Sequence, residues 1–369
     1  THALKWQKYE GREILPMWVA DMDFGAPPAV QEAIIARADH EIFGYTQVPS
    51  ALNDRVVERM HSLYSWTIRP ESILWLPGVV TGLNIACRAF AGPSRTIVTT
   101  TPVYPPFLSA PANQDKQLAA VPMIDINRRF CLDFDRIEAE FKKGAGLFML
   151  CSPANPCGTV FTREELAHLV SLCRTYQVIL CSDEIHADFV LNPDLIHLPA
   201  AAVSRTAEQL TVTLMAPSKT YNIPGLGASF AIIPDPDLRK EFRAGCRGVV
   251  PEVNIMGLVA AQAVYTHADE WLSQLIEYLR TNRDLVFERV NRMPGCRLYS
   301  IDATYLAWID VSKTGLNDPV AFFEQAGVGL SDGAFFGQNG FVRLNFGCPR
   351  SLLKEGLDRM ENALNLLFS

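Results

Sequence analysis

The fold of this chain can be argued outward from one segment, Val178-Ile-Leu-Cys-Ser-Asp-Glu-Ile-His186. Its first five residues are small or apolar and contain no charge, which is typical of a strand buried on both faces. Amphipathic stretches separate this run from similar ones at Thr96–Thr100, Leu147–Cys151, Thr211–Ala216 and Ala228–Ile233. Strands that alternate with helices predict a mostly parallel sheet covered by helices, and therefore the α/β class.

Helical periodicity flanks this sheet region on both sides. It runs from Pro27 to Arg69 before the sheet and from Pro251 to about Arg292 after it. A smaller α+β unit follows, with strands at Tyr305–Val311 and Phe341–Phe346 and a terminal helix from Ser351. We expect an N-terminal segment, 1–40, that joins the small domain, a large domain, 41–255, and a small C-terminal domain, 256–369.

Composition narrows the class of protein. A length of 369 residues is enough for one large domain or two ordinary ones. With 49% hydrophobic and 20% charged residues, the chain can bury a sizeable core. The net charge of −7 argues against nucleic acid or an anionic membrane as the main partner. No apolar run is long enough to span a bilayer, and the first residues show no signal or transit pattern. Nine cysteines without a Cys-x-x-Cys pair and seven scattered histidines predict neither disulfides nor a metal site, as is typical of a reducing, cytoplasmic location.

Three predicted strands end in polar residues, at the edge of the sheet where ligands bind in α/β proteins. They place Asn155 after Leu147–Cys151, Asp183 after Val178–Ser182 and Lys219 after Thr211–Ala216. Taken singly, each residue also has a purely structural explanation. Asn155 could belong to a tight turn, Asp183 could cap a helix or form an ion pair, and Lys219 could lie in a surface loop. A lysine buried there would instead have a lowered pKa and a free amine suited to Schiff-base formation.

Taken together, Asn155, Asp183 and Lys219 follow one another one βα unit apart. This pattern resembles the fold-type I pyridoxal-5′-phosphate (PLP) enzymes of the aminotransferase class I/II superfamily, over essentially the whole chain. The resemblance implies that Lys219 forms a Schiff base with PLP and shuttles protons as a catalytic residue. It also implies that Asp183 keeps the pyridine nitrogen protonated, so that the ring can accept electrons, and that Asn155 hydrogen-bonds the 3′-oxygen of the ring.

The same resemblance assigns a seat for the cofactor phosphate. Gly78, Val79 and Val80 would provide it at the start of a helix, where free N–H groups favour an anion. Ser218 and Thr220 are candidate hydroxyl donors to the same phosphate.

The remaining contacts implied by the resemblance come from three other parts of the chain. Tyr104, in Thr101-Pro-Val-Tyr104, would stack on the ring, and we count it with Lys219 as catalytic. Tyr45 would reach the phosphate of a neighbouring subunit, which implies a homodimer with shared sites. Arg343 would clamp the substrate α-carboxylate through two parallel hydrogen bonds.

Departures from the common aminotransferase pattern narrow the resemblance further. Ala216 and Gly227 stand where many relatives carry a serine and an arginine on the phosphate, and His186, which we expect at the cofactor, stands where tyrosine is common. These departures and the string Trp18-Val-Ala-Asp-Met-Asp-Phe24 resemble the MalY/PatB-type cystathionine β-lyase branch, the C–S lyases. The backbone at Val19 and Ala20 would line the substrate carboxylate pocket.

This branch implies a PLP-dependent carbon–sulfur β-lyase that cleaves cystathionine or a related S-substituted L-cysteine to pyruvate, ammonia and a thiol. The alternative is an aminotransferase with a 2-oxo acid acceptor, because the same lysine serves both reactions. A regulatory binding protein on this fold is a third hypothesis, which an intact Asn155, Asp183, Lys219 and Arg343 set disfavours. The expected partners are a small amino-acid substrate and a second copy of the chain, without nucleic acid or membrane.

Overall fold

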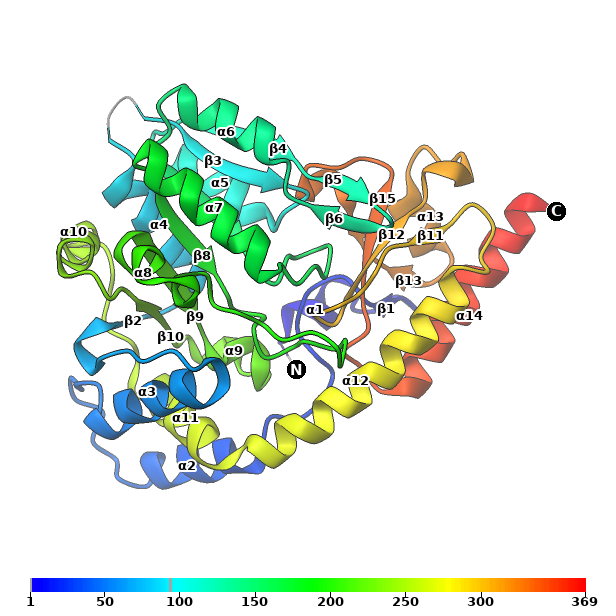
Figure 1. The fold of residues 1–369 in the computed structure, drawn as a ribbon. Coiled ribbons are helices and arrows are strands. Elements are labelled where there is room, and N and C mark those ends of the chain that lie inside the picture. Colours follow the sequence, from blue (N-terminus) through cyan, green and yellow to red (C-terminus); the bar gives the residue numbers. More distant parts are fainter. Residues whose placement is uncertain (1, 93–94) are drawn as a thin grey trace.

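The computed structural model describes residues 2–92 and 95–369 and shows a large and a small lobe (Figure 1). A seven-stranded sheet in the order β2-β10-β9-β8-β7-β3-β4 forms the centre of the large lobe. Only β10 runs against its neighbours, so the predicted α/β class is confirmed. The strands are β2 Ile73–Leu76, β3 Ile97–Thr101, β4 Leu118–Pro122, β7 Leu147–Cys151, β8 Ile179–Asp183, β9 Thr211–Met215 and β10 Ser229–Ile232.

All five predicted strands of this sheet are confirmed, with ends that differ by at most one residue. Sequence analysis missed the two edge strands, β2 and β4. β4 carries mixed exposed and buried positions and ends in a proline, which suits an edge but weakens an apolar pattern. β8 runs one residue further than predicted, so Asp183 is its last residue rather than the first residue after it.

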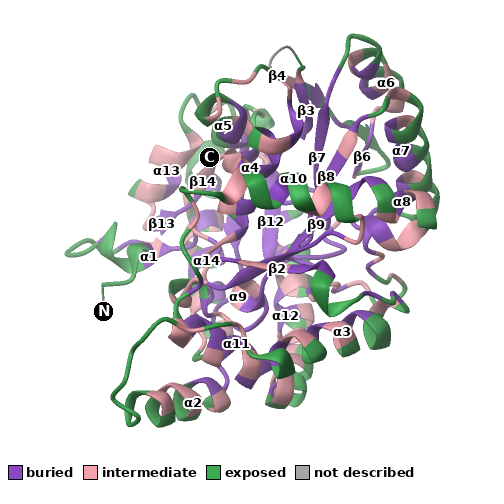
Figure 2. Ribbon diagram, turned by 90° about the vertical axis from the view of Figure 1, so that its left-hand side faces the viewer, coloured by how far each residue is buried: buried purple, intermediate pink, exposed green. Residues whose placement is uncertain are grey.

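Helices cover both faces of the sheet, and Figure 2 shows the strands buried between them. Side chains of β8 alternate between two apolar clusters: Leu180 packs with the helices on one face and Cys181 with those on the other. The first cluster includes α6 Phe134–Lys142, α7 Arg163–Tyr176 and α8 Arg205–Leu210, and the second α4 Val79–Phe90, α5 Pro105–Asn113 and α10 Pro236–Cys246.

The helices begin where the sequence provides caps. At the start of α7 the Thr162 hydroxyl accepts from the Glu165 N–H at 3.2 Å, and the Glu165 carboxylate accepts from the Thr162 N–H at 2.8 Å. These two reciprocal hydrogen bonds form a capping box. Gly78 precedes α4 and provides no side-chain cap, which leaves the first N–H groups of that helix free.

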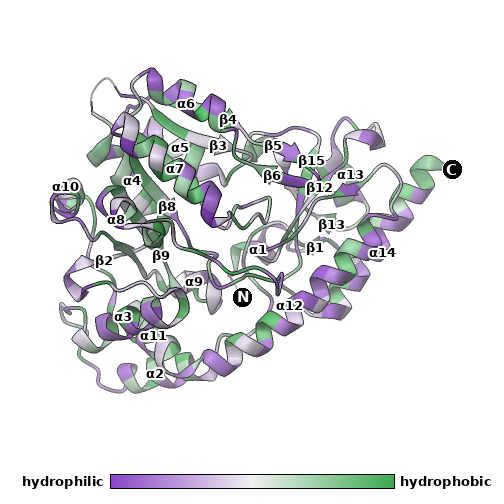
Figure 3. Ribbon diagram, viewed as in Figure 1, coloured by the Kyte–Doolittle hydropathy of each residue, from purple (hydrophilic) through white to green (hydrophobic). Residues whose placement is uncertain are grey.

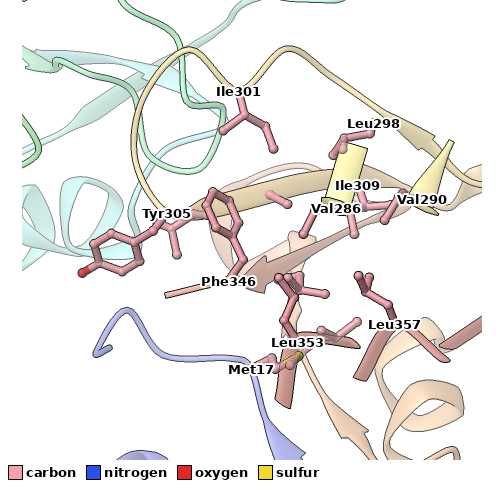
Figure 4. Packing of buried hydrophobic residues seen from close by; sticks show 14 of the residues in the cluster. Met17, Val286, Val290, Leu298, Ile301, Tyr305, Ile309, Phe346, Leu353 and Leu357 are labelled. Atoms are coloured by element: carbon pink, nitrogen blue, oxygen red, sulfur yellow. The ribbon is translucent and has the colours of Figure 1, made fainter. Parts of the chain in front are cut away.

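The small lobe contains a four-stranded sheet in the order β11-β12-β15-β14. Val286, Phe346 and Leu353 meet Met17 in its core (Figure 4). Figure 3 shows hydrophilic and hydrophobic residues side by side along α14, as expected for a helix with one buried face. The elements are β11 Arg297–Leu298, β12 Leu306–Asp310, β14 Ser331–Asp332, β15 Phe341–Asn345, α12 Asp269–Val290, α13 Pro319–Gln325 and α14 Arg350–Phe368, joined to the large lobe by α11 Ile255–His267.

The N-terminal segment connects both lobes. β1 Leu15–Pro16 pairs in parallel with β13 Val328–Gly329 of the small lobe. The next helix, α2 Pro28–Ala38, packs against α11 instead. The domain boundaries at residues 40 and 255 stay predictions. The remaining α-helices and strands are the 15-residue α3 Ser50–Tyr64 and the short elements α1 Leu4–Gln7, α9 Pro217–Thr220, β5 Ile124–Ile126 and β6 Arg129–Cys131, the last two forming a hairpin.

Candidate active site

A cavity of about 200 Å³ lies at the carboxyl ends of β7, β8 and β9, between the two lobes. It brings together most of the residues selected from the sequence: Val19, Ala20, Gly78, Val79, Val80, Tyr104, Asn155, Asp183, His186, Lys219 and Arg343. A larger and more open concavity of about 740 Å³ lies between Asn127 and Phe287. None of those residues lines it, so we place the chemistry in the smaller and more enclosed cavity.

Asp183 is a buried carboxylate with few partners. Its Oδ1 accepts one hydrogen bond, from the Ile185 N–H at 3.1 Å. Within residues 2–92 and 95–369 no cation pairs with it. Burial raises the pKa of Asp183 to about 7, and the Ile185 N–H only partly opposes this. A cationic N–H group in the cavity would satisfy the carboxylate and keep it ionised.

Lys219 lies on the single turn of α9, directly after β9. Its Nζ donates to the Ala20 carbonyl at 2.8 Å and lies 3.4 Å from Asp21 Oδ1. Burial lowers the pKa of Lys219, and Asp21 opposes the shift. The side chain is therefore held in the cavity with an amine that deprotonates more readily than a surface lysine. Asp21 was missed from the sequence, although it lies in the quoted Trp18–Phe24 string.

Arg343 is a buried guanidinium without an acidic partner in the described part of the chain. Its two Nη groups donate to Asn155 Oδ1 at 3.0 Å and to the Trp18 carbonyl at 2.8 Å, while Nε has no partner there. The guanidinium lies 4.6 Å from the ring centre of Phe336. Burial lowers the pKa of Arg343 to about 10, so it remains charged at neutral pH. An uncompensated positive charge in a cavity is suited to a carboxylate ligand.

Asn155 and His186 are two further polar residues of the cavity wall. Asn155 was expected to contact a cofactor ring, and in this structure its Oδ1 instead accepts from Arg343. His186 is buried, and its Nδ1 has no partner among the described residues. Burial, helped by Lys219 and Arg343, lowers the pKa of His186 to about 3, so the ring is neutral.

The start of α4 forms the end of the cavity at Gly78, Val79 and Val80. Because no side chain caps this helix, its first N–H groups and the helix dipole favour an anion there. Gly227 lies nearby in a left-handed conformation, with φ of +59°, and a Cβ there would come 3.4 Å from the Pro77 carbonyl. The left-handed backbone conformation favours glycine at this position.

Three residues selected from the sequence do not line the cavity. The hydroxyl of Thr220 donates to Asp188 Oδ2 at 2.7 Å, so the expectation that it binds the phosphate is wrong. The other oxygen of Asp188 pairs with Arg59, and none of these three residues lines the cavity. Ser218 is half-buried beside the cavity but not part of its wall. Tyr45 is fully exposed, in the segment between α2 and α3.

Two structural features bear on other classes of site. None of the described helices could cross a membrane. Within the same residues no group of three or more His, Cys, Asp or Glu side chains could hold a metal ion.

Comparisons with known proteins agree with this geometry. The family model for aminotransferase class I and II matches residues 12–360. Cystathionine beta-lyase PatB of Bacillus subtilis is 37% identical over 99% of this chain and 97% of its own length. The crystal structure of OvoB superposes with a TM-score of 0.97 at 44% identity, covering 99% of this chain and 96% of that one. The PLP-bound C-S lyase from Staphylococcus hominis gives a TM-score of 0.91 at 30% identity, covering 98% and 94%.

The family match spans nearly the whole chain, and the relatives align over both lobes and the cavity between them. The resemblance noted from Asn155, Asp183 and Lys219 is confirmed at the level of the family and the fold. This chain belongs to the aminotransferase class I and II family.

Proposed function

We propose that this protein is a PLP-dependent carbon–sulfur β-lyase that acts on cystathionine or a related S-substituted L-cysteine. One observation carries the proposal: an available lysine, an unpaired buried acid and an unpaired buried arginine surround one cavity. The names of the relatives, a cystathionine beta-lyase and a C-S lyase, support this reaction over others in the family.

The residues present fit PLP. The buried carboxylate of Asp183 lacks a cation, which the protonated pyridine nitrogen would provide. The uncapped start of α4 would bind the phosphate, and Lys219 provides the amine that bonds the aldehyde carbon. When bound, PLP supplies an electron sink for negative charge that develops on the substrate α-carbon.

Arg343 and Lys219 bind and deprotonate the substrate. The Nη groups of Arg343 and its free Nε recognise the α-carboxylate, which fixes the substrate in the cavity. The Lys219 amine then removes the α-proton as a general base, since burial favours its neutral form. With PLP bound, Asp183 would hold the proton on the pyridine nitrogen.

Tyr104 and His186 keep the cavity walls neutral. Burial raises the pKa of Tyr104, so its hydroxyl stays protonated and can donate a hydrogen bond toward the reacting group. His186 carries no charge at neutral pH because its pKa is lowered. The lasting positive charge that faces the substrate is therefore that of Arg343.

The test is pyruvate release from L-cystathionine by PLP-loaded protein without any 2-oxo acid. Sustained, stoichiometric pyruvate and thiol would support the β-lyase. A single half-turnover that resumes only after a 2-oxo acid is added would instead identify an aminotransferase and overturn the proposal.

We also propose a homodimer with shared sites, in a reducing compartment such as the cytoplasm. Tyr45, Ile42 and Phe43 are exposed together in the segment between α2 and α3, which supports a partner subunit at this surface. The nine free cysteines, seven of them buried, suit a reducing compartment.

Mixing two inactive variants tests the shared site. A heterodimer of Lys219→Ala and Tyr45→Ala subunits contains one site with both changes and one with neither. Exchange of subunits should restore about a quarter of the wild-type activity. No recovery despite demonstrated exchange would assign Tyr45 to its own subunit or to no site.

A further inference from the structure

A segment of seven residues, 17–23, crosses the cavity and is fixed from both lobes; we call it the strap. From the small lobe, Asn345 Nδ2 donates to the Val19 and Asp21 carbonyls, and the Tyr305 hydroxyl donates to the Ala20 carbonyl at 2.8 Å. From the large lobe, Asn222 Nδ2 donates to the Met22 carbonyl at 2.9 Å. The backbone on both sides of Asp21 is therefore held in place, and this fixes where its side chain can reach.

The Asp21 carboxylate reaches Lys219. Its Oδ1 lies 3.4 Å from Lys219 Nζ, and the side chain is 35% exposed, so it lies between the cavity and the solvent. No other carboxylate of the described residues lies within ion-pair distance of Lys219. Lys5 binds the Asp21 backbone carbonyl and pairs with Asp23, so it does not compete for the Asp21 side chain.

The other groups that face the Lys219 amine cannot do what Asp21 does. Asp183, from β8, attracts the ammonium from a longer distance, and Arg343, from β15, repels it. His186 and Tyr104 are uncharged at neutral pH. The carboxylate in contact with the amine is thus the one on the strap.

We propose that Asp21 is a positioning residue for Lys219. Together with the Ala20 carbonyl, its carboxylate holds the lysine amine in place when that amine is released from the cofactor, and stabilises its ammonium form once it has taken a proton. This inference rests on the proposed function, in which Lys219 is released from the cofactor and takes a proton from the substrate. The contact keeps the proton-carrying amine directed at the strap side of the cavity and gives it a route to solvent through a half-exposed acid.

The function proposed above does not use this residue, although it lies in the string that most distinguishes the sequence. Asp23 lies two residues further along the same strap and provides an internal comparison. Its carboxylate accepts from Lys5 Nζ at 2.7 Å and from Trp6 Nε1 at 2.9 Å, so it anchors the strap to α1 and makes no contact with Lys219. Asp21 acts on the lysine, whereas Asp23 only fixes the strap.

Competitive acetylation of Lys219 in the full-length chain, freed of cofactor, tests this role. The extent of labelling is measured by mass spectrometry from about pH 6 to about pH 10, against a free amine as internal standard. In Asp21→Asn the ammonium loses its counter-charge, so labelling below its pH midpoint should be about tenfold faster than in wild type. Asp21→Glu retains the charge and should behave like wild type.

Asp23→Asn is the matched control for a loosened strap. It should leave labelling of Lys219 within about twofold of wild type. Equal acceleration in Asp21→Asn and Asp23→Asn, or none in Asp21→Asn, would overturn the proposal. Because labelling needs neither substrate nor cofactor, a protein that fails the pyruvate assay but shows the Asp21 effect would disprove only the proposed function.

Discussion

The end of β8 places two consecutive buried acids in opposite situations. Glu184 accepts from the Ser182 hydroxyl at 2.8 Å and the Ala200 N–H at 2.9 Å, and its other oxygen lies 2.7 Å from His197 Nε2. The Asp183 side chain is also buried, but among the described residues it accepts only from the Ile185 N–H. Protein interiors normally satisfy such groups, so an acid left short of partners indicates a place kept for a ligand.

The same difference extends to the surroundings of each acid. Outside the cavity, the Asp188 carboxylate is paired with Arg59 and accepts a hydrogen bond from the Thr220 hydroxyl. In the cavity, Arg343 Nε and His186 Nδ1 have no partner among the described residues. Among the described residues, Glu184 and Asp188 thus have charged or hydroxyl partners, whereas the cavity holds an acid, an arginine and a histidine with unused hydrogen-bonding capacity.

Replacing Lys219 should have the largest effect on the cavity side. Lys219→Ala should lower turnover by at least about 10⁴-fold, because it removes both the covalent bond to the cofactor and the general base. The absorbance of lysine-bound PLP should disappear, and persistence of that band would contradict the assignment. Lys5→Met is a control, since Lys5 is an even more buried lysine that pairs with Asp23 instead of lining the cavity, and the band should remain in that variant.

Exchanging each of the two neighbouring acids for its amide tests the comparison directly. Asp183→Asn should lower kcat by about 10² to 10³-fold, because an amide cannot hold a proton on the ring nitrogen. Glu184→Gln should instead lower the free energy of unfolding by about 2 kcal/mol, because it removes the charged acceptor of a buried network.

Kinetics and denaturant unfolding of both variants separate the two roles. Glu184→Gln should keep kcat within about tenfold of wild type. If Asp183→Asn turned over normally and unfolded more easily, Asp183 would be a structural cap of the same kind as Glu184.

Arg343→Gln should act on substrate binding. Loss of two charge-assisted hydrogen bonds to the α-carboxylate should raise KM about 100-fold, with a smaller effect on kcat. The free energy of unfolding should fall by only about 1 to 2 kcal/mol, from the lost hydrogen bonds to Asn155 and the Trp18 carbonyl, since no acid in the described chain pairs with this guanidinium. Steady-state kinetics with L-cystathionine measures the split between KM and kcat, and a pure fall in kcat would argue against carboxylate binding.

Three of the cavity-lining residues could be selected from the sequence because they lie at the ends of apolar strands, whereas Tyr104, Arg343, Val19 and Ala20 were placed by the family resemblance. Asn155, Asp183 and Lys219 each stand within a few residues of a strand end, and the parallel sheet brings such ends to one edge. The helix start at Gly78 had a local signal too. Periodicity and turn chemistry are local properties, so they identify these places without knowledge of the tertiary structure.

Contacts between distant segments had no such signal. Asp21 reaches Lys219 across 198 positions of the sequence, and Arg343 reaches Asn155 across 188. Thr220 was misassigned because its partner, Asp188, lies on a different loop, and nothing in Pro217–Thr220 shows which way the hydroxyl points. Side-chain direction on a single helical turn depends on what packs around it, which only the folded chain determines.

The smallest predicted effect is a pH-dependent loss in the free energy of unfolding, caused by the buried Asp183 carboxylate. Burial raises its pKa in the folded chain to about 7, above the ordinary value of 3.8. The folded state therefore binds this proton more tightly than the unfolded state does. The resulting stability is fully present below pH 3.8 and is lost as the pH rises through about 7.

Asp183→Asn removes this pH dependence, and Glu184→Gln should not. Between about pH 5.5 and about pH 8, cofactor-free wild type should lose about 2 kcal/mol of stability relative to Asp183→Asn. Urea unfolding of both proteins across that range measures the difference. A constant difference would mean that Asp183 has a hydrogen-bonded partner in solution, and the contrast with Glu184 would then fail. If Asp183→Asn had a much lower kcat but were more stable than wild type at pH 8, Asp183 would be a residue that lowers the stability of the fold in order to bind the ligand.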